Sequence, residues 1–68
     1  MLRLKEIRKS RGLTQKELAS RVGIAQGYLS SLETGVYLPG LEVLVKLALV
    51  LECSLDELVD ISAFSAAS

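Results

Sequence analysis

Residues 13–35 read LTQKELASRVGIAQGYLSSLETG, and this stretch sets the fold of the whole chain. Apolar side chains recur at helical spacing on both sides of the short segment GIA (residues 23–25), which predicts two helices joined by a tight turn. Thr14 and Glu17 form the T-x-x-E pattern of a capping box, so the first helix should begin there and run to about Val22. The glycine that follows stops this helix.

The turn between these two helices meets the requirements of a helix-turn-helix motif. Ala19 is the small side chain needed where the helices cross, and Gly23 supplies the turn. Four apolar side chains have the spacing to anchor both helices to a core: Leu18, Ile24, Leu29 and Leu32. A basic segment precedes the motif and two further helical segments follow it. The complete pattern is specific, whereas one alanine and one glycine alone would mean little.

The rest of the chain also has helical periodicity, with no segment that alternates every two residues. Gly35 and Pro39 separate two helical segments, and an S-x-x-E capping box begins at Ser54. The predicted helices cover residues 2–11, 14–22, 25–33, 41–51 and 54–61. The sequence therefore predicts an all-α, compact five-helix domain over residues 1–61, followed by a short C-terminal tail over residues 62–68.

Length and composition exclude several classes of protein. The 68 residues suffice for one small domain, and a single cysteine without any histidine excludes an internal disulfide framework and a conventional zinc site. The N-terminal residues do not resemble a signal peptide, and the longest apolar run is too short to span a membrane. An enzyme is not expected, because the chain lacks histidine, a glycine-rich phosphate loop and a carboxylate pair in a cleft. We expect a soluble, intracellular protein with no cofactor and no metal.

The formal net charge of zero conceals two oppositely charged halves. Residues 1–21 carry seven basic side chains against two acidic ones, whereas residues 22–68 carry one basic side chain against six acidic ones. This asymmetry indicates a basic face suited to nucleic acid. The alternative is that the charges are scattered over short helices and paired in salt bridges.

Residues 13–35, together with LEVLVKLALVLECSLDELV (residues 41–59), resemble the Cro/C1-type helix-turn-helix family of phage-repressor and XRE-like proteins. The resemblance covers Leu4 to Val59. It implies a lambda-repressor-like domain that places its third helix in the major groove of double-stranded DNA and binds a palindromic operator as a dimer. Such a protein would be a cytoplasmic, prokaryotic or phage-encoded regulator of the repressor, controller or autoregulating antitoxin type. Whether it has a protein partner such as a toxin stays open.

The resemblance also implies which residues contact DNA. Gln15 and Gln26 have the spacing of the family's glutamine pair, in which the first braces the second and contacts a phosphate. A glutamine at position 26 can bond adenine through N6 and N7, and this role is favoured over the alternative of an ordinary solvated side chain. Positive charge must come from Arg11 and Lys16, with Lys9 or Arg21 as further candidates. The full set of expected DNA-binding residues is Arg11, Gln15, Lys16, Gln26, Gly27, Tyr28, Ser30, Ser31 and Tyr37.

Several positions depart from the family pattern. Relatives usually carry a basic residue at Ser31 and a Lys/Arg pair at Val36 and Tyr37, and many have a serine cap at Ala25. Because phosphate contacts supply much of the affinity for DNA, each domain is expected to bind weakly. These departures and the apolar GVYLPG loop motivate a second hypothesis, in which the same fold serves as a protein-interaction module that has lost DNA binding.

Three other side chains have mainly structural interpretations. Arg8 and Glu33 match an ion pair of the family that ties the first helix to the third, and we interpret the pair as structural rather than DNA-binding. Cys53 lies in an apolar setting, where core packing is favoured over a redox role. Tyr28 either packs beneath the third helix or touches the DNA backbone.

The helix predicted over residues 41–51 carries more apolar side chains than one core face requires. The expected core face is Leu41, Leu44, Leu47, Ala48 and Leu51. A helix that is apolar on all sides is either fully buried or meets a partner, and a domain of this size cannot bury it alone. The surplus predicts a homodimer interface built on some of Val43, Leu49, Val50, Val59, Ile61 and Phe64. The alternative is scattered exposed apolar residues, which are common.

Overall fold

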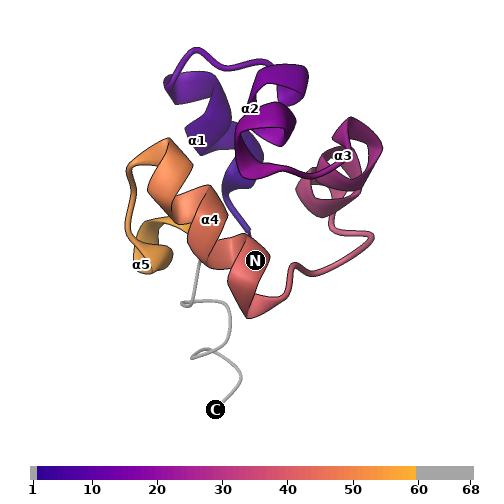
Figure 1. Ribbon diagram of the computed structural model, residues 1–68. Coiled ribbons are helices and arrows are strands. Elements are labelled where there is room, and N and C mark those ends of the chain that lie inside the picture. Colours follow the sequence, from indigo (N-terminus) through magenta and orange to yellow (C-terminus); the bar gives the residue numbers. More distant parts are fainter. Residues whose placement is uncertain (1, 60–68) are drawn as a thin grey trace.

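The computed structural model describes residues 2–59 and has five helices in that range. They are α1 (Leu4–Ser10), α2 (Gln15–Val22), α3 (Gln26–Thr34), α4 (Leu41–Leu51) and α5 (Leu55–Leu58). In Figure 1, α4 lies in the middle of the molecule, with α5 on one side and α3 on the other, and α1 and α2 lie above it. This arrangement confirms the all-α, five-helix fold predicted from the sequence.

The core draws leucines from every helix, because each helix is too short to bury a face without the others. Seven leucines are less than 2% exposed: Leu4, Leu18, Leu29, Leu32, Leu47, Leu51 and Leu58. Helix α2 packs against both α3 and α4, and its Ala19 is 3% exposed. Ile24, in the turn, is half-buried against the same core. The residues expected to anchor the helix-turn-helix therefore do so.

Both predicted capping boxes are present. At the start of α2, Thr14 Oγ1 accepts from the Glu17 backbone N–H and Glu17 Oε1 accepts from the Thr14 backbone N–H, both at 3.0 Å. Ser54 and Glu57 repeat this arrangement before α5. Gly23 follows the last residue of α2 as its C-terminal cap, and its φ of 85° favours glycine. Ala25, the cap residue just before α3, provides no side-chain hydrogen bond to the helix.

The predicted bounds of the first and last helices were too wide. Helix α1 begins at Leu4 because Leu2 forms an isolated antiparallel bridge with Val59, and the Arg3 N–H donates to the Leu58 carbonyl at 2.8 Å. Helix α5 ends at Leu58 because Val59 turns to extended backbone, with φ −107° and ψ 118°. The predicted domain boundary at 61/62, Ile61 and Phe64 lie outside the described residues. Within residues 2–59, no helix has the length and apolar character needed to cross a bilayer.

Candidate nucleic-acid interface

The first turn of α3 presents polar groups to solvent. Gln26 and Gly27 are exposed, and Ser30, one turn later, is half-buried. Among residues 2–59, the Gln26 amide has no hydrogen-bond partner. Its carbonyl oxygen and its NH₂ group therefore remain available to an external donor and acceptor. Helix α3 itself is held in place by the buried Leu29 and Leu32.

Ser31 is used within its own helix. Its hydroxyl donates to the Gly27 carbonyl at 3.1 Å, and its backbone carbonyl accepts from Thr34 Oγ1 at 3.2 Å. With the hydroxyl hydrogen occupied, Ser31 has only lone pairs to offer. A phosphate oxygen also accepts, so this rotamer of Ser31 does not suit a phosphate contact.

A buried ion pair joins α1 to α3. Arg8 Nε donates to Glu33 Oε2 at 2.6 Å and Arg8 Nη2 donates to Glu33 Oε1 at 3.3 Å, while the two side chains are 9% and 2% exposed. Arg8 Nη1 also donates to the Leu13 carbonyl at 2.8 Å. The pair expected from the sequence is thus present, and it is nearly dry.

Gln15 joins this pair, which the sequence did not predict. Its Nε2 donates to Glu33 Oε1 at 2.9 Å, and the side chain is half-buried at the start of α2. The eleven-residue spacing predicted that Gln15 would brace Gln26, whereas in the structure the hydrogen-bond partner of Gln15 is the Glu33 carboxylate. No local sequence signal marks this bond, because residues 15 and 33 meet only once α2 and α3 cross.

The basic N-terminal half is only partly neutralised by ion pairs. Arg3 lies 3.7 Å from Glu6, and Arg8 pairs with Glu33. Lys9, Lys16 and Arg21 are exposed and have no ion-pair partner among residues 2–59. The alternative that all these charges are paired in salt bridges therefore fails for these three residues.

Arg11 has a structural role that the sequence did not predict. Its Nε donates to the Leu51 carbonyl at 2.7 Å, and its Nη2 lies 3.4 Å from the Glu52 carbonyl. These carbonyls belong to the C-terminal end of α4, where backbone acceptors lack helical partners. Arg11 is thus a C-terminal cap for α4, with two of its guanidinium nitrogens donating to backbone carbonyls. A contact across 40 residues has no signature in the local sequence.

The two tyrosines lie next to each other. Their ring centroids are 6.4 Å apart with an interplanar angle of 43°, a separation typical of aromatic pairs. Tyr28 is half-buried against the core, and Tyr37 is 58% exposed in the loop before α4. Tyr28 therefore packs within the domain, and Tyr37, a loop residue, is the aromatic neighbour of Tyr28.

Helix α4 exposes a different set of apolar residues from the one predicted. Leu41 was expected in the core but is 73% exposed, because only the later turns of α4 reach the centre of the domain. Val43, Val50 and Val59 are half-buried, and the first two pack against the core. On a helix with 3.6 residues per turn, Val43 and Val50 lie about 120° and 100° from Leu49.

The exposed apolar residues of α4 form a stripe at i, i+4 and i+8 spacing. We call this stripe, together with one exposed leucine in the loop before the helix, the α4 apolar surface. Its members are Leu38, Leu41, Val45 and Leu49, with exposed fractions of 80%, 73%, 39% and 73%. An ion pair between Lys46 and Glu42, 3.4 Å apart, lies on the exposed side of the same helix. The spacing of this stripe was visible in the sequence but could not be assigned to a face before the core was known.

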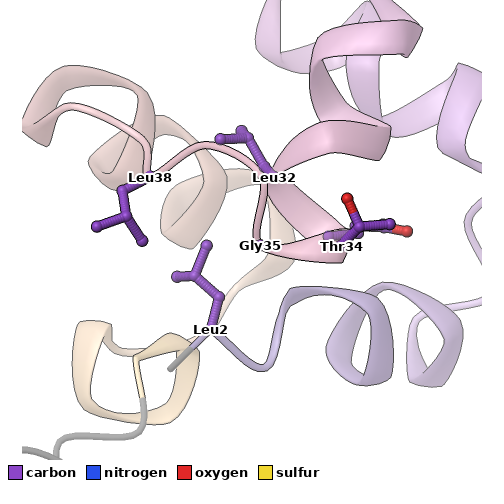
Figure 2. Close-up of a pocket in the computed structure, with 6 residues that line it drawn as sticks. Leu2, Leu32, Thr34, Gly35 and Leu38 are labelled. Carbon is purple, nitrogen blue, oxygen red and sulfur yellow. The ribbon is translucent and has the colours of Figure 1, made fainter.

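A pocket of about 270 Å³ lies at the C-terminal end of α3, and Figure 2 shows its lining. The lining residues are Leu2, Leu32, Glu33, Thr34, Gly35 and Leu38. Leu2 and Leu38 enter it from opposite sides. The Glu33 carboxylate is already bonded to Arg8 and Gln15, so this pocket presents an apolar surface without a free ionisable group.

Cys53 packs where the sequence suggested. It is half-buried against the core, and burial, followed by the nearby Glu57 carboxylate, raises the pKa of its thiol. A raised thiol pKa lowers the thiolate fraction and hence the reactivity of the sulfur. This setting favours a packing role over a redox role.

Comparisons with known proteins agree with this geometry. A helix-turn-helix family model matches residues 4–58. The HTH-type transcriptional regulator SinR of Bacillus subtilis is 39% identical over 59 residues, covering 85% of this chain and 53% of SinR. The ImmF control region 10 kDa protein of Bacillus phage phi105 is 36% identical over 55 residues, covering 81% of this chain and 61% of that protein. The chain therefore spans less than two thirds of the length of these relatives.

Solved structures of such proteins have the same fold. SinR in complex with DNA is similar with a TM-score of 0.74 at 39% identity, over 78% of this chain and 86% of that one. SinR in its complex with SinI gives a TM-score of 0.81 at 36% identity, over 93% of this chain and 62% of that one. The restriction-modification controller protein C.AhdI of Aeromonas hydrophila gives 0.79 at 35% identity, over 84% of this chain and 86% of that one.

Proposed function

The chain belongs to the helix-turn-helix family of Cro/C1-type transcriptional regulators, which are not enzymes, and we propose that it binds double-stranded DNA with α3 in the major groove. The observation that carries this proposal is the unpaired Gln26 amide at the exposed start of a helix whose other side is fixed to the core. SinR, similar in sequence and fold, has been solved in complex with DNA. The site of action would be the cytoplasm of a prokaryotic cell.

Gln26 is the proposed base reader. A side-chain amide offers one acceptor and one donor group side by side, which matches the N6 donor and N7 acceptor of adenine in the major groove. Ser30, on the same side of α3, is the second proposed contact. Neither side chain carries charge, so α3 contributes sequence preference and little of the general attraction to DNA.

The general attraction is proposed to come from Lys16, supported by Lys9 and Arg21. These side chains are exposed and keep their charge free of ion pairs within residues 2–59. Each phosphate contact adds close to one unit to the dependence of log K on log salt. With few such contacts, the salt dependence should be modest but clearly different from zero.

The first experiment is a selection of bound sequences from random duplex DNA, followed by affinity measurements on the preferred site. Gln26→Ala should cost about 1–3 kcal/mol on that site and relax the choice at one position, with binding to random duplex almost unchanged. Equal losses on preferred and random DNA would remove Gln26 from the reader role.

Lys16→Ala tests the charge separately. It should weaken all sequences alike and reduce the salt slope by about one unit. Arg3→Ala is the matched control, because Arg3 is exposed just before α1 and already lies 3.7 Å from Glu6. A salt slope near zero for the unmodified protein would contradict DNA binding by the basic half.

We also propose that the chain binds a palindromic operator as a homodimer. One helix-turn-helix contacts few base pairs, whereas two copies related by a two-fold axis place their reading helices about 34 Å apart and double the contacts. The proposed interface is the α4 apolar surface, which contains Leu49 from the expected set and adds Leu38, Leu41 and Val45. An antiparallel pairing of two α4 helices about Val45 would set Leu41 against the partner's Leu49 and bring opposite charges from Glu42 and Lys46 together.

Sedimentation of the DNA-free protein tests this interface. Leu49→Glu should shift the protein from dimer to monomer at tens of micromolar, while Ser20→Glu, an exposed position on α2, should leave the dimer intact. A native monomer at these concentrations, or a dimer that survives Leu49→Glu, would place the interface elsewhere.

The second candidate function is a protein-interaction module. The observation that favours it is the run of exposed apolar side chains in the loop before α4, where Val36 is 68% and Leu38 is 80% exposed. SinR has been solved in complex with another protein, SinI. A dimer with no measurable affinity for duplex DNA at low salt would support this function over the first.

A further inference from the structure

The Glu33 carboxylate decides which way the Gln15 amide faces. Glu33 Oε1 receives both Arg8 Nη2 at 3.3 Å and Gln15 Nε2 at 2.9 Å, and the side chain is 2% exposed. A carboxylate paired with a guanidinium can only accept hydrogen bonds. Gln15 must therefore turn its NH₂ group inward, and the orientation of its amide follows from chemistry.

This orientation determines what Gln15 offers on its outer side. One N–H of Nε2 is bonded to Glu33, while the carbonyl oxygen Oε1 and the second N–H have no partner among residues 2–59. Gln15 lies in the first turn of α2, in the same unit as the exposed Lys16 and beside the helix that carries Gln26. A long side chain fixed before binding loses less conformational freedom when it contacts a ligand.

We infer that Glu33, held by Arg8, is a positioning residue for DNA binding that acts through Gln15. The ion pair thus has a role beyond joining α1 to α3: it presents the free edge of the Gln15 amide in one orientation. This inference rests on the proposed DNA-binding function, but it makes a separate claim. The contribution of Glu33 to affinity exists only while Gln15 is present.

A thermodynamic cycle on the preferred duplex tests this dependence. The four proteins are the unmodified chain, Gln15→Ala, the double variant Arg8→Met/Glu33→Met, and the triple variant that combines them. Replacing both members of a buried ion pair by apolar side chains often preserves stability, so this double variant avoids leaving one charge unpaired. Arg3→Gln/Glu6→Gln, which removes an exposed pair at the start of α1 and leaves the net charge unchanged, is the matched control.

Gln15→Ala and Arg8→Met/Glu33→Met should each weaken specific binding by about tenfold, the effect of one hydrogen bond to a charged group. The triple variant should bind no more weakly than Gln15→Ala alone, and the control pair should bind like the unmodified chain. If the two tenfold losses multiply to about a hundredfold loss in the triple variant, Glu33 acts independently of Gln15, and the inference is overturned. Unchanged binding by Gln15→Ala would also overturn it and leave the proposed function intact, whereas failure of the unmodified chain to bind any duplex would contradict the function itself.

If Arg8→Met/Glu33→Met does not fold, as judged by circular dichroism, the bond can be tested without DNA. In Glu33→Gln, the side-chain NH₂ signals of Gln15 in a ¹H–¹⁵N spectrum should move toward those of a solvated glutamine such as Gln26. Unchanged signals would mean that the carboxylate does not orient Gln15.

Discussion

Helices α3 and α4 follow each other in the chain but relate to the domain in opposite ways. On α3, Leu29 and Leu32 are buried, Glu33 is bonded to two other helices, and the exposed Gln26 is the notable unpaired group. Helix α4 buries Leu47 and Leu51 yet leaves a stripe of apolar side chains in water. Contacts within the domain thus cover α3 apart from one polar edge, whereas they cover only one side of α4.

The ion pairs of the two helices show the same contrast. Arg8 and Glu33 are nearly dry, whereas the side chains of Lys46 and Glu42 are 52% and 84% exposed. Because the first pair is buried, removing one of its members should cost much stability. Because the second pair is exposed, it should contribute little to stability. This difference predicts that substitutions of the buried residues of α3 act through folding, and substitutions of the exposed apolar residues of α4 act through association.

The largest expected effect is on the buried pair. Arg8→Ala should lower the free energy of unfolding by about 3–5 kcal/mol, because Glu33 would be left buried without its cation. Lys46→Ala, the matching change on α4, should cost at most about 0.5 kcal/mol. Urea denaturation followed by circular dichroism measures both, and equal losses would break the contrast between the two helices.

The next effect compares two leucines. Leu29→Ala should cost about 2–5 kcal/mol, since Leu29 has no exposed surface and its removal leaves a cavity. Leu49→Ala, at a position that is 73% exposed, should change the stability of the monomer by no more than about 0.5 kcal/mol. These measurements belong at low protein concentration, where a dimer would not contribute to stability.

A third effect sharpens the account of α3. Ala25 has the extended backbone of a helix cap, with φ −70° and ψ 145°, but no side-chain acceptor. Ala25→Ser should therefore raise the stability by about 0.5–1 kcal/mol, while Thr14→Ala should lower it by about 1 kcal/mol. An unchanged melting temperature for Ala25→Ser would mean that the backbone N–H groups in the first turn of α3 already have other hydrogen-bond partners.

The smallest effect concerns pH. Hydrogen bonds from the Thr14 backbone and side chain lower the pKa of Glu17 below its ordinary value of 4.5. A lowered pKa in the folded state gives stability that is present above 4.5 and is lost as pH falls through the folded value. Glu17→Gln should flatten the decline in melting temperature below pH 4.5. An unchanged decline would assign the acid sensitivity to other carboxylates.

The sequence predicted what depends on local patterns. Capping boxes at Thr14 and Ser54, the stop at Gly23 and the anchoring leucines of α3 all follow from spacing over one or two helical turns. The C-terminal bound of α2 and both bounds of α4 were right for the same reason. The Arg8–Glu33 pair, although distant in sequence, came from resemblance to a family whose fold brings those positions together.

What the sequence missed depends on contacts between distant segments. Arg11 caps α4 from 40 residues away, and Gln15 meets Glu33 across the crossing of two helices. Leu41 has the spacing of a core residue, but its turn of α4 lies beyond the reach of the other helices. Periodicity identifies the helix and cannot say how much of it the remaining domain covers.

The pairing of Leu2 with Val59 has a consequence for the order of folding. It closes a loop that contains almost the whole described chain, so its entropic cost is met only once intervening contacts have shortened the effective loop. The helix-turn-helix, whose contacts are local, can assemble before this loop closes. The Leu2–Val59 bridge should therefore form last and break first. Amide hydrogens such as that of Arg3, bonded to the Leu58 carbonyl, would then exchange with solvent by a local opening that leaves α2 and α3 folded.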